Sequence, residues 1–333
     1  MDQYVIKVSN IRKKFKTYKS SLSNKGLLSS IIRHYYDKKA LDGLGMEIKR
    51  GEITALLGAN GSGKSTLIKI MTGVLYPDSG EVTVNGLVPW KDRIKLSSQM
   101  GVVFSQQSNL YYDLPPVDTF NYMRHLYGIP EKTFNQRLDY LVKILELKNV
   151  YTRQTRLLSF GERMKCNFVT AVLHNPSVVF LDEATVGIDL PSRFALRRAL
   201  IDMKKRFGTT FIIATHIVDD IEALAERIIF LDRGKIIFDG SKEKFNKILG
   251  DVRHVELHFK GDITIRPSDY GKVLEHEANY MKLEINANKI KSKFISDLLL
   301  SKQLLDYSVY EPDLGYILKK FYEAVEKRHR RRR

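Results

Sequence analysis

The chain has 333 residues, of which 43% are hydrophobic, and a formal net charge of +17. This length allows a large core and a second small domain, at roughly 100–200 residues per domain. No apolar run reaches the roughly 18 residues that a membrane-spanning helix needs, and the N-terminus lacks the pattern of a secretory signal. A single cysteine, Cys166, excludes an internal disulfide and a cysteine metal site, and it suits a cytosolic compartment.

The positive charge is concentrated in two segments. Residues 12–39 hold nine Lys or Arg against Asp37 alone, and residues 327–333 add six more. We therefore interpret the chain as a nearly neutral core with a basic insertion at about residues 16–39 and a basic tail. Such clusters fit the anionic cytoplasmic face of a membrane. Nucleic acid, or a solvated charge run without a specific partner, are the alternatives, and the location of the charge outside the core argues against nucleic acid.

Strand-like and helix-like segments alternate along the chain, which predicts an α/β fold. The expected strands are residues 51–58, 80–86, 100–106, 176–183 and 209–216. The expected helices are residues 63–75, 119–129, 134–147 and 217–227, so that a helical subdomain falls at about 107–170. Residues 227–240 are typical of a hairpin that turns at Arg233-Gly234.

After about residue 250 the motifs that carry chemistry stop. Strands are expected at residues 252–261, 280–287 and 304–312, and helices at 290–302 and 314–328. The chain is thus predicted to consist of a domain at residues 1–249 and a small α+β accessory domain with the basic tail at 250–333.

The stretch GANGSGKST matches the phosphate-binding loop G-x-x-x-x-G-K-[ST] between a predicted strand and a predicted helix. Gly58, Gly61 and Gly63 allow backbone N–H groups to turn inward around a polyphosphate, and the helix adds its positive end. Lys64 is expected beside the β- and γ-phosphates, and the hydroxyl of Ser65 is expected to ligate Mg²⁺.

Polar side chains follow three further predicted strands. Asp182 and Glu183 end VVFLDE, Gln106 ends GVVFSQ, and His216 ends FIIATH. Ligands in open α/β sheets bind outside the carboxyl ends of the strands. We expect Asp182 at the Mg²⁺, Glu183 as the general base for the attacking water, and Gln106 and His216 near the γ-phosphate.

The stretch LSFGER contains a helix start, because Ser159 and Glu162 have the spacing of a capping box. The first N–H groups of a helix also form an anion site, whether the anion belongs to the same chain or to another. Ser159 and Gly161 would therefore fit a nucleotide phosphate presented by a second copy.

Together these motifs, in their order and spacing from about Tyr4 to Gly240, resemble the ATP-binding subunits of ABC transporters, with a phosphate-loop NTPase fold. The resemblance implies that two subunits enclose two ATP molecules, that Asp189 belongs to a loop linking the two sites, and that Gln106 ligates Mg²⁺ and couples the nucleotide state to a membrane subunit. The expected nucleotide-binding residues are Phe15, Gly58, Asn60, Gly61, Gly63, Lys64, Ser65, Thr66, Ser159, Gly161 and Asp189.

Two positions in LSFGE depart from the family's usual LSGGQ: Phe160 replaces a glycine, and Glu162 places a carboxylate where an amide is common. A carboxylate close to phosphate would repel it. We therefore predict that Glu162 bends back to cap its own helix. The aromatic residue that stacks on adenine is expected upstream of the phosphate loop; Phe15 is the best candidate by position, with the aromatics of the insertion as alternatives: Tyr18, Tyr35 and Tyr36.

A finer resemblance, to ATPases of ABC-2 type exporters, includes a branch associated with efflux of drugs or viologen-like compounds. It implies an ATP-hydrolysing subunit on the cytoplasmic face of the membrane that uses Mg²⁺, works as a homodimer or heterodimer, and drives export through separate permease chains. The alternatives are an importer ATPase and a soluble ABC ATPase that acts on ribosomes or nucleic acid.

Overall fold

The computed structural model describes residues 3–19, 34–104, 107–260, 271–286 and 304–330. The chain forms two compact units, Met1–Lys242 and Glu243–Arg333. The second unit begins before the predicted boundary at residue 250, because Phe245 is fully buried and its ring lies 5.3 Å from that of Phe321.

The first unit is built on a six-stranded sheet with the order β5-β6-β7-β3-β8-β9. Neighbouring strands are parallel except β9, which pairs antiparallel with β8. The strands β3, β6 and β7 are buried along their whole length, as expected for parallel strands covered on both faces. The bounds are β3 (Ile53–Leu57), β5 (Met100–Phe104), β6 (Val178–Asp182), β7 (Thr210–Ala214), β8 (Arg227–Asp232) and β9 (Lys235–Ser241).

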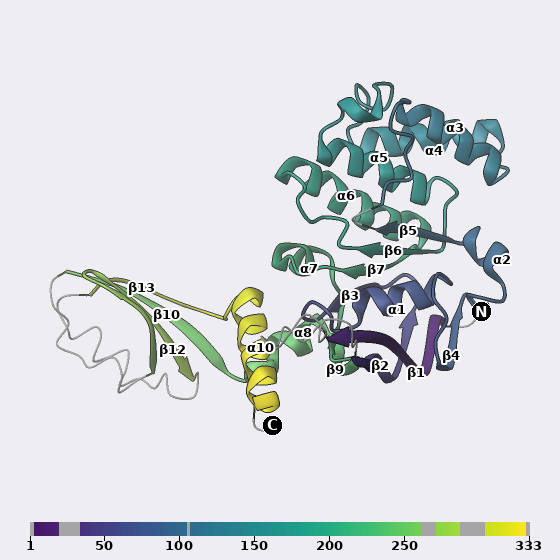
Figure 1. The fold of residues 1–333 in the computed structure, drawn as a ribbon. Helices are drawn as coiled ribbons and strands as arrows, with labels where there is room; N and C mark the ends of the chain where they lie inside the picture. The colour runs from purple at the N-terminus through teal and green to yellow at the C-terminus, as the bar shows by residue number, and fades with distance from the viewer. Residues whose placement is uncertain (1–2, 20–33, 105–106, 261–270, 287–303, 331–333) are drawn as a thin grey trace, which may run out of the picture. The chain divides into compact units, whose positions relative to one another are not determined.

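A second, antiparallel sheet has the order β2-β1-β4, with β1 (Tyr4–Lys19), β2 (His34–Lys49) and β4 (Ser79–Val84). Helix α1 (Lys64–Met71) packs in one apolar cluster with side chains of both sheets, including Val8 of β1 and Phe180 of β6. Figure 1 shows α1 between the two sheets. The phosphate loop that precedes α1 is thereby held between them.

The described ends of the predicted insertion continue β1 and β2 as a two-stranded antiparallel ribbon. Pairing runs from Lys14 with Lys39 to Lys19 with His34. A charge count does not predict this ribbon, because lysine is a poor strand former and the residues look like a solvated run. Residues 20–33 lie outside the described part of the chain.

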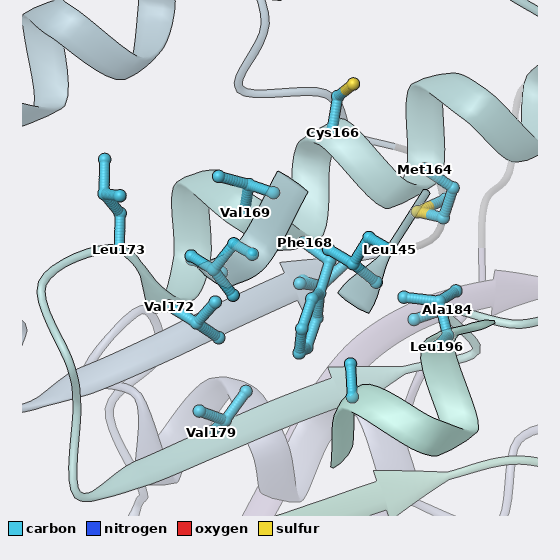
Figure 2. Close-up of a cluster of buried hydrophobic side chains, with 14 of the residues drawn as sticks. Leu145, Met164, Cys166, Phe168, Val169, Val172, Leu173, Val179, Ala184 and Leu196 are labelled. Carbon is cyan, nitrogen blue, oxygen red and sulfur yellow. The ribbon is translucent and has the colours of Figure 1, made fainter. Parts of the chain in front are cut away.

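Helices cover the other face of the six-stranded sheet and form the predicted helical subdomain (Figure 1). The side chain of Phe168 on α5 lies in the apolar cluster between α5 and the sheet, with Val179 of β6 and Leu196 of α6 (Figure 2). The subdomain consists of α3 (Pro116–Leu126), α4 (Glu131–Ile144) and α5 (Phe160–Val172), while α6 (Leu190–Phe207) and α7 (Val218–Leu224) contribute to the same apolar cluster. The short helix α2 (Arg93–Ser97) packs instead in the cluster that contains α1.

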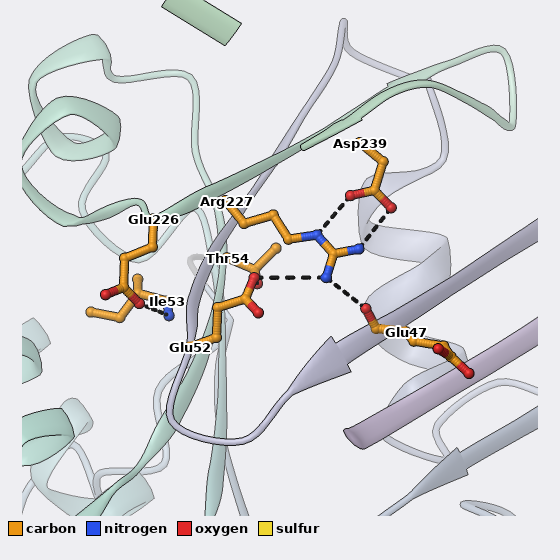
Figure 3. A network of polar contacts seen from close by, with 7 residues as sticks. All are labelled: Glu47, Glu52, Ile53, Thr54, Glu226, Arg227 and Asp239. Carbon is orange, nitrogen blue, oxygen red and sulfur yellow. Dashed lines mark hydrogen bonds and ion pairs between the residues drawn. The ribbon is translucent and has the colours of Figure 1, made fainter. Parts of the chain in front are cut away.

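The guanidinium of Arg227 links the two sheets of the first unit (Figure 3). It donates to both carboxylate oxygens of Asp239 on β9, at 2.6 and 2.8 Å, and to the carbonyl of Glu47 on β2 at 2.7 Å. Glu52, 3.8 Å away, adds a second carboxylate. These paired bonds fix the end of β2 against the β8–β9 edge, beside the start of β3.

The second unit contains a four-stranded antiparallel sheet with the order β11-β12-β10-β13. The strand β11 was not predicted, because it is largely exposed and lacks a clear apolar alternation. The predicted helix at 290–302 lies outside the described residues. The bounds are α8 (Lys242–Asn246), β10 (Val252–Phe259), β11 (Lys272–Glu277), β12 (Tyr280–Asn286), β13 (Leu304–Tyr310) and α10 (Leu314–Arg330). Throughout the described chain, no helix combines the length and apolar character that crossing a membrane requires.

Candidate functional site

Three adjacent parallel strands bring the predicted site residues to one edge of the six-stranded sheet. The phosphate loop follows β3, Asp182 and Glu183 end β6, and His216 follows β7, which lies between the other two. Since the carboxyl ends of parallel strands share an edge, residues more than a hundred positions apart in sequence meet there.

The glycines of the phosphate loop are favoured by their backbone conformation, and two of them also by lack of space. Gly58, Gly61 and Gly63 have φ values of 146°, 77° and 114°. A Cβ at Gly58 would lie 2.2 Å from the carbonyl oxygen of Leu231, and one at Gly63 would lie 2.6 Å from that of Ala40. Glycine is therefore favoured by conformation and by space at Gly58 and Gly63, and by conformation at Gly61.

Lys64 is buried at the start of α1, and its ammonium lies inside the loop. It donates to the carbonyl oxygens of Gly58 at 2.7 Å and Ala59 at 3.3 Å. Burial lowers the pKa of Lys64, although Glu183 and Asp182 act in the opposite direction. A polyphosphate would offer this ammonium stronger, charged acceptors than the two carbonyls.

Ser65 and Asp182 meet across the sheet edge. The Ser65 hydroxyl donates to Oδ1 of Asp182 at 3.2 Å. Burial raises the pKa of Asp182, and this hydrogen bond partly opposes the effect. A cation between the two oxygens would favour the ionised carboxylate.

Glu183 and His216 form the outer part of the same edge. Oε1 of Glu183 lies 3.8 Å from Nδ1 of His216. Glu183 has a positive φ of 54°, unusual for a residue with a side chain, and its N–H donates to the carbonyl of Ala214 at 2.8 Å. The backbone of β7 thus holds Glu183 in an unfavourable conformation, a feature typical of functional sites.

A hollow of about 220 Å³ lies over the phosphate loop. It is lined by Phe15, Lys38, Ala40, Asn60, Gly61, Gly63, Lys64, Ser65, Thr66 and Glu183. Most of the predicted loop contacts and one of the predicted aromatics therefore surround one cavity. Lys38 and Ala40 were not predicted, because the sequence does not show that the end of the insertion lies beside the phosphate loop.

The aromatic alternatives differ in position. Phe15 borders the hollow with 41% of its surface exposed, whereas Tyr36 is exposed and is not among the lining residues. The side chains of Tyr18 and Tyr35 lie outside the described part of the chain, as does Gln106.

Ser159 and Gly161 lie at the N-terminus of α5 and do not border this hollow. The predicted capping box is present: the N–H of Glu162 donates to Ser159 Oγ at 3.2 Å, and the N–H of Ser159 donates to Glu162 Oε2 at 2.8 Å. The carboxylate of Glu162 is therefore engaged by its own helix, as predicted. Phe160 is 39% exposed and is covered on one side by the guanidinium of Arg163, 5.7 Å from the ring centre.

Asp189 lies against the start of α5. Its carboxylate caps α6 by accepting from the N–H of Ser192 at 3.1 Å, and this bond holds the pKa of Asp189 below its usual range. A Cβ at Gly161 would approach Oδ1 of Asp189 to 2.1 Å. Gly161 thus allows the Asp189 loop to pack directly on the α5 N-terminus.

The residues present fit a magnesium ion that is held jointly with a nucleotide. Within the described residues, no three His, Cys, Asp or Glu side chains gather in a way that could hold a metal. Mg²⁺ commonly takes one or two protein oxygens, phosphate oxygens and water. The paired oxygens of Ser65 and Asp182 supply such a partial site.

The sheet order, the glycine loop and the acids at the end of β6 define a phosphate-loop nucleotide-binding protein. Residues 41–186 match the sequence model of the family described as ABC transporter. The chain is 30% identical over 295 residues to the linearmycin resistance ATP-binding protein LnrL of Bacillus subtilis, covering 85% of this chain and 94% of that protein. It is 32% identical to the energy-coupling factor transporter ATP-binding protein EcfA2 of Clostridium perfringens, covering 66% of this chain and 78% of that protein.

A further relative is longer than this chain. ABC transporter G family member 20 of Dictyostelium discoideum is 36% identical over 215 residues, and the match spans 64% of this chain but 29% of that protein. Among solved structures, cbiO1 from Clostridium perfringens, described as part of the ABC transporter complex cbiONQ, aligns with a TM-score of 0.60 at 28% identity, over 73% of this chain and 91% of that one. The chain belongs to the family of ABC transporter ATP-binding proteins, and it is an ATPase of that class.

Proposed function

We propose that this chain is the ATP-hydrolysing subunit of an exporter that moves its substrate through separate ABC-2 type permease chains. One observation carries this proposal: the similarity to the linearmycin resistance ATP-binding protein covers 85% of the chain. The first unit alone contains 242 residues, so this similarity extends into the second unit. The similarity to the energy-coupling factor protein covers 66%.

We assign the hydrolytic roles from the residues around the hollow together with the family resemblance. Lys64 binds the β- and γ-phosphates, and the loop N–H groups surround them. Glu183 accepts a proton from the attacking water as general base, while His216, 3.8 Å from it, contacts the γ-phosphate. Gln106 contacts the same phosphate and the metal, and Phe15 stacks on the adenine.

Ser65 and Asp182 hold Mg²⁺ together with the phosphate oxygens, and Gln106 completes the protein's contribution. When bound, the ion neutralises charge that develops on the phosphate oxygens. The protein residues orient the nucleotide and the water independently of that contribution.

Two chains complete each site. Ser159 Oγ accepts from Glu162, so its proton remains free to be donated to an anion. The first N–H groups of α5, including that of Gly161, lack acceptors within the helix. We infer that this terminus binds the nucleotide of a second subunit, with Asp189 connecting the two sites, and that a homodimer forms.

The chain then acts at the cytoplasmic face of the membrane, attached to its permeases. The basic β1–β2 ribbon and the basic end of α10 add attraction to anionic lipid. Affinity purification of the full chain in mild detergent tests the partners. Multi-span permeases are expected, and recovery of ribosomal subunits or DNA instead would contradict a transport function.

Import is the second candidate, and the similarity to the energy-coupling factor protein supports it. Inside-out vesicles that contain the chain and its permeases distinguish the two directions, with linearmycin, the compound in the name of the resistance protein, as the probe. Export predicts ATP-dependent accumulation of linearmycin in these vesicles, and none with Glu183→Gln. ATP-dependent loss of preloaded linearmycin from the same vesicles would indicate import.

A further inference from the structure

The hollow over the phosphate loop contains a cation with no assigned role. Lys38 of β2 borders the hollow, and its Nζ lies 3.9 Å from the position a Cβ would take at Gly61. With the residues that the structure describes, Lys38 forms no ion pair or hydrogen bond. Its charge therefore lies at the loop without an acceptor among the side chains and backbone groups of the described residues.

The pairing of β1 and β2 determines what lies beside Lys38. Its antiparallel partner is Phe15, and directly opposed residues project from the same face of a ribbon. Both side chains border the same hollow. Lys39, the next residue, projects from the other face and lies 3.5 Å from Asp42.

The backbone that carries Lys38 is fixed against the loop. A Cβ at Gly63 would lie 2.6 Å from the carbonyl oxygen of Ala40, which shows how closely β2 approaches the start of α1. The β8–β9 turn connects the phosphate loop to β2. The N–H of Gly234 donates to the carbonyl oxygen of Ser62 at 2.8 Å, and the N–H of Asp42 donates to that of Gly234 at 3.0 Å. A hydrogen-bonded strand, rather than a loose insertion, thus positions Lys38.

We propose that Lys38 is a second phosphate-binding lysine. The β1–β2 ribbon then contacts both ends of a bound adenosine polyphosphate, with Phe15 against the base and Lys38 against the phosphates. An ammonium on a flexible stem suits phosphate as a point charge. The ligand class is a nucleoside di- or triphosphate, because the loop end of the hollow receives the distal phosphates. This inference rests on the nucleotide site of the proposed function.

The test is calorimetric titration of the full chain with ATP and with AMP. Lys38→Ala should weaken ATP binding about tenfold and leave AMP within about twofold, as expected for loss of one charged phosphate contact. Lys38→Arg should restore most of the ATP affinity. Lys39→Ala, the matched control on the other face of the ribbon, should change neither affinity.

Unchanged ATP affinity in Lys38→Ala would overturn the inference. Equal weakening of ATP and AMP would also overturn it, because it would show that Lys38 acts by supporting Phe15. Lys64→Ala separates this result from the proposed function: if that variant also binds ATP normally, the nucleotide site itself is misplaced. Thermal unfolding of each variant confirms that the fold is retained.

Discussion

The hydroxyl of Ser65 donates to the carboxylate of Asp182 at 3.2 Å, across 117 positions of sequence. Ser65 lies in the first turn of the helix after β3, and Asp182 ends β6, with β7 between these strands. The sheet order brings two oxygen ligands together without any local sequence connection. We infer that this pair forms the protein part of a magnesium site.

Asp182→Asn tests that site. The amide keeps the shape and can still bond Ser65 but removes the negative charge, so the increase in ATP affinity caused by Mg²⁺ should be lost. ATP binding in EDTA should remain within about twofold of the unchanged protein, since Lys64 and the loop are intact. Titrations with and without Mg²⁺ measure the difference, and an undiminished magnesium effect would exclude Asp182 as a ligand.

Gly63→Ala should destabilise the first unit by about 3 kcal/mol, because it combines an unfavourable φ with overpacking. The added Cβ would approach the carbonyl oxygen of Ala40 to 2.6 Å, and backbone cannot move away as a flexible side chain would. Urea unfolding measures the loss. Gly86→Ala is the matched control, because Gly86 has a φ of 75° with nothing within 4 Å of an added Cβ. It should cost about 1 kcal/mol, and an equal cost at both glycines would show that the contact with β2 is unimportant.

Glu162→Gln should leave ATPase activity within about twofold, because glutamine also fits the capping box and the carboxylate is turned back onto its own helix. Ser159→Ala should cost about 1 kcal/mol of unfolding free energy by removing the cap, and it should lower turnover as well. Steady-state phosphate release and urea unfolding measure the two effects. A large rise in activity with Glu162→Gln would mean that the carboxylate repels nucleotide after all.

His174 predicts a pH dependence of stability. Its Nε2–H donates to the carbonyl of Met100 at 3.0 Å, and its ring stacks on Tyr127 at 4.0 Å. Burial lowers the pKa of His174 from its ordinary 6.5 to about 4, and Arg137 adds to the effect. Between these values the unfolded chain binds a proton that the folded chain does not, so stability falls as the pH drops, by up to about 3 kcal/mol at pH 4.

Urea midpoints at pH 7, 5.5 and 4.5 measure this loss. Carboxylates also titrate in the acid part of this range, so the difference between the natural chain and His174→Gln isolates the histidine. The variant should be less stable at pH 7 but show a shallower decline. Parallel declines in the two proteins would show that His174 does not contribute.

The motifs of the first unit were predictable because each depends on a local requirement. GANGSGKST needs its glycines for conformation, and Ser159 and Glu162 reveal a helix start by spacing alone. The turn at Arg233-Gly234 was equally visible, and both residues have a positive φ, as a tight hairpin demands.

Other features depend on contacts between distant segments and could not be predicted. The approach of Lys38 to Gly61 follows from the packing of β2 on the phosphate loop, which is stabilised by the two hydrogen bonds of Gly234 to Ser62 and Asp42. Neither bond has a sequence pattern. The exposed strand β11 lacked an apolar face that would have predicted it.

The central claim is that one ATP is bound between the phosphate loop of one subunit and Ser159 and Gly161 of another. Hydrolysis, with Glu183 as general base, then allows the two subunits to separate. Sedimentation velocity of full-length Glu183→Gln, with saturating ATP and its permeases supplied, tests it most directly. The account predicts that the variant binds ATP, does not turn it over and sediments with two copies of the chain in each complex. A chain that stays single under these conditions, or a Glu183→Gln variant with full turnover, would contradict it.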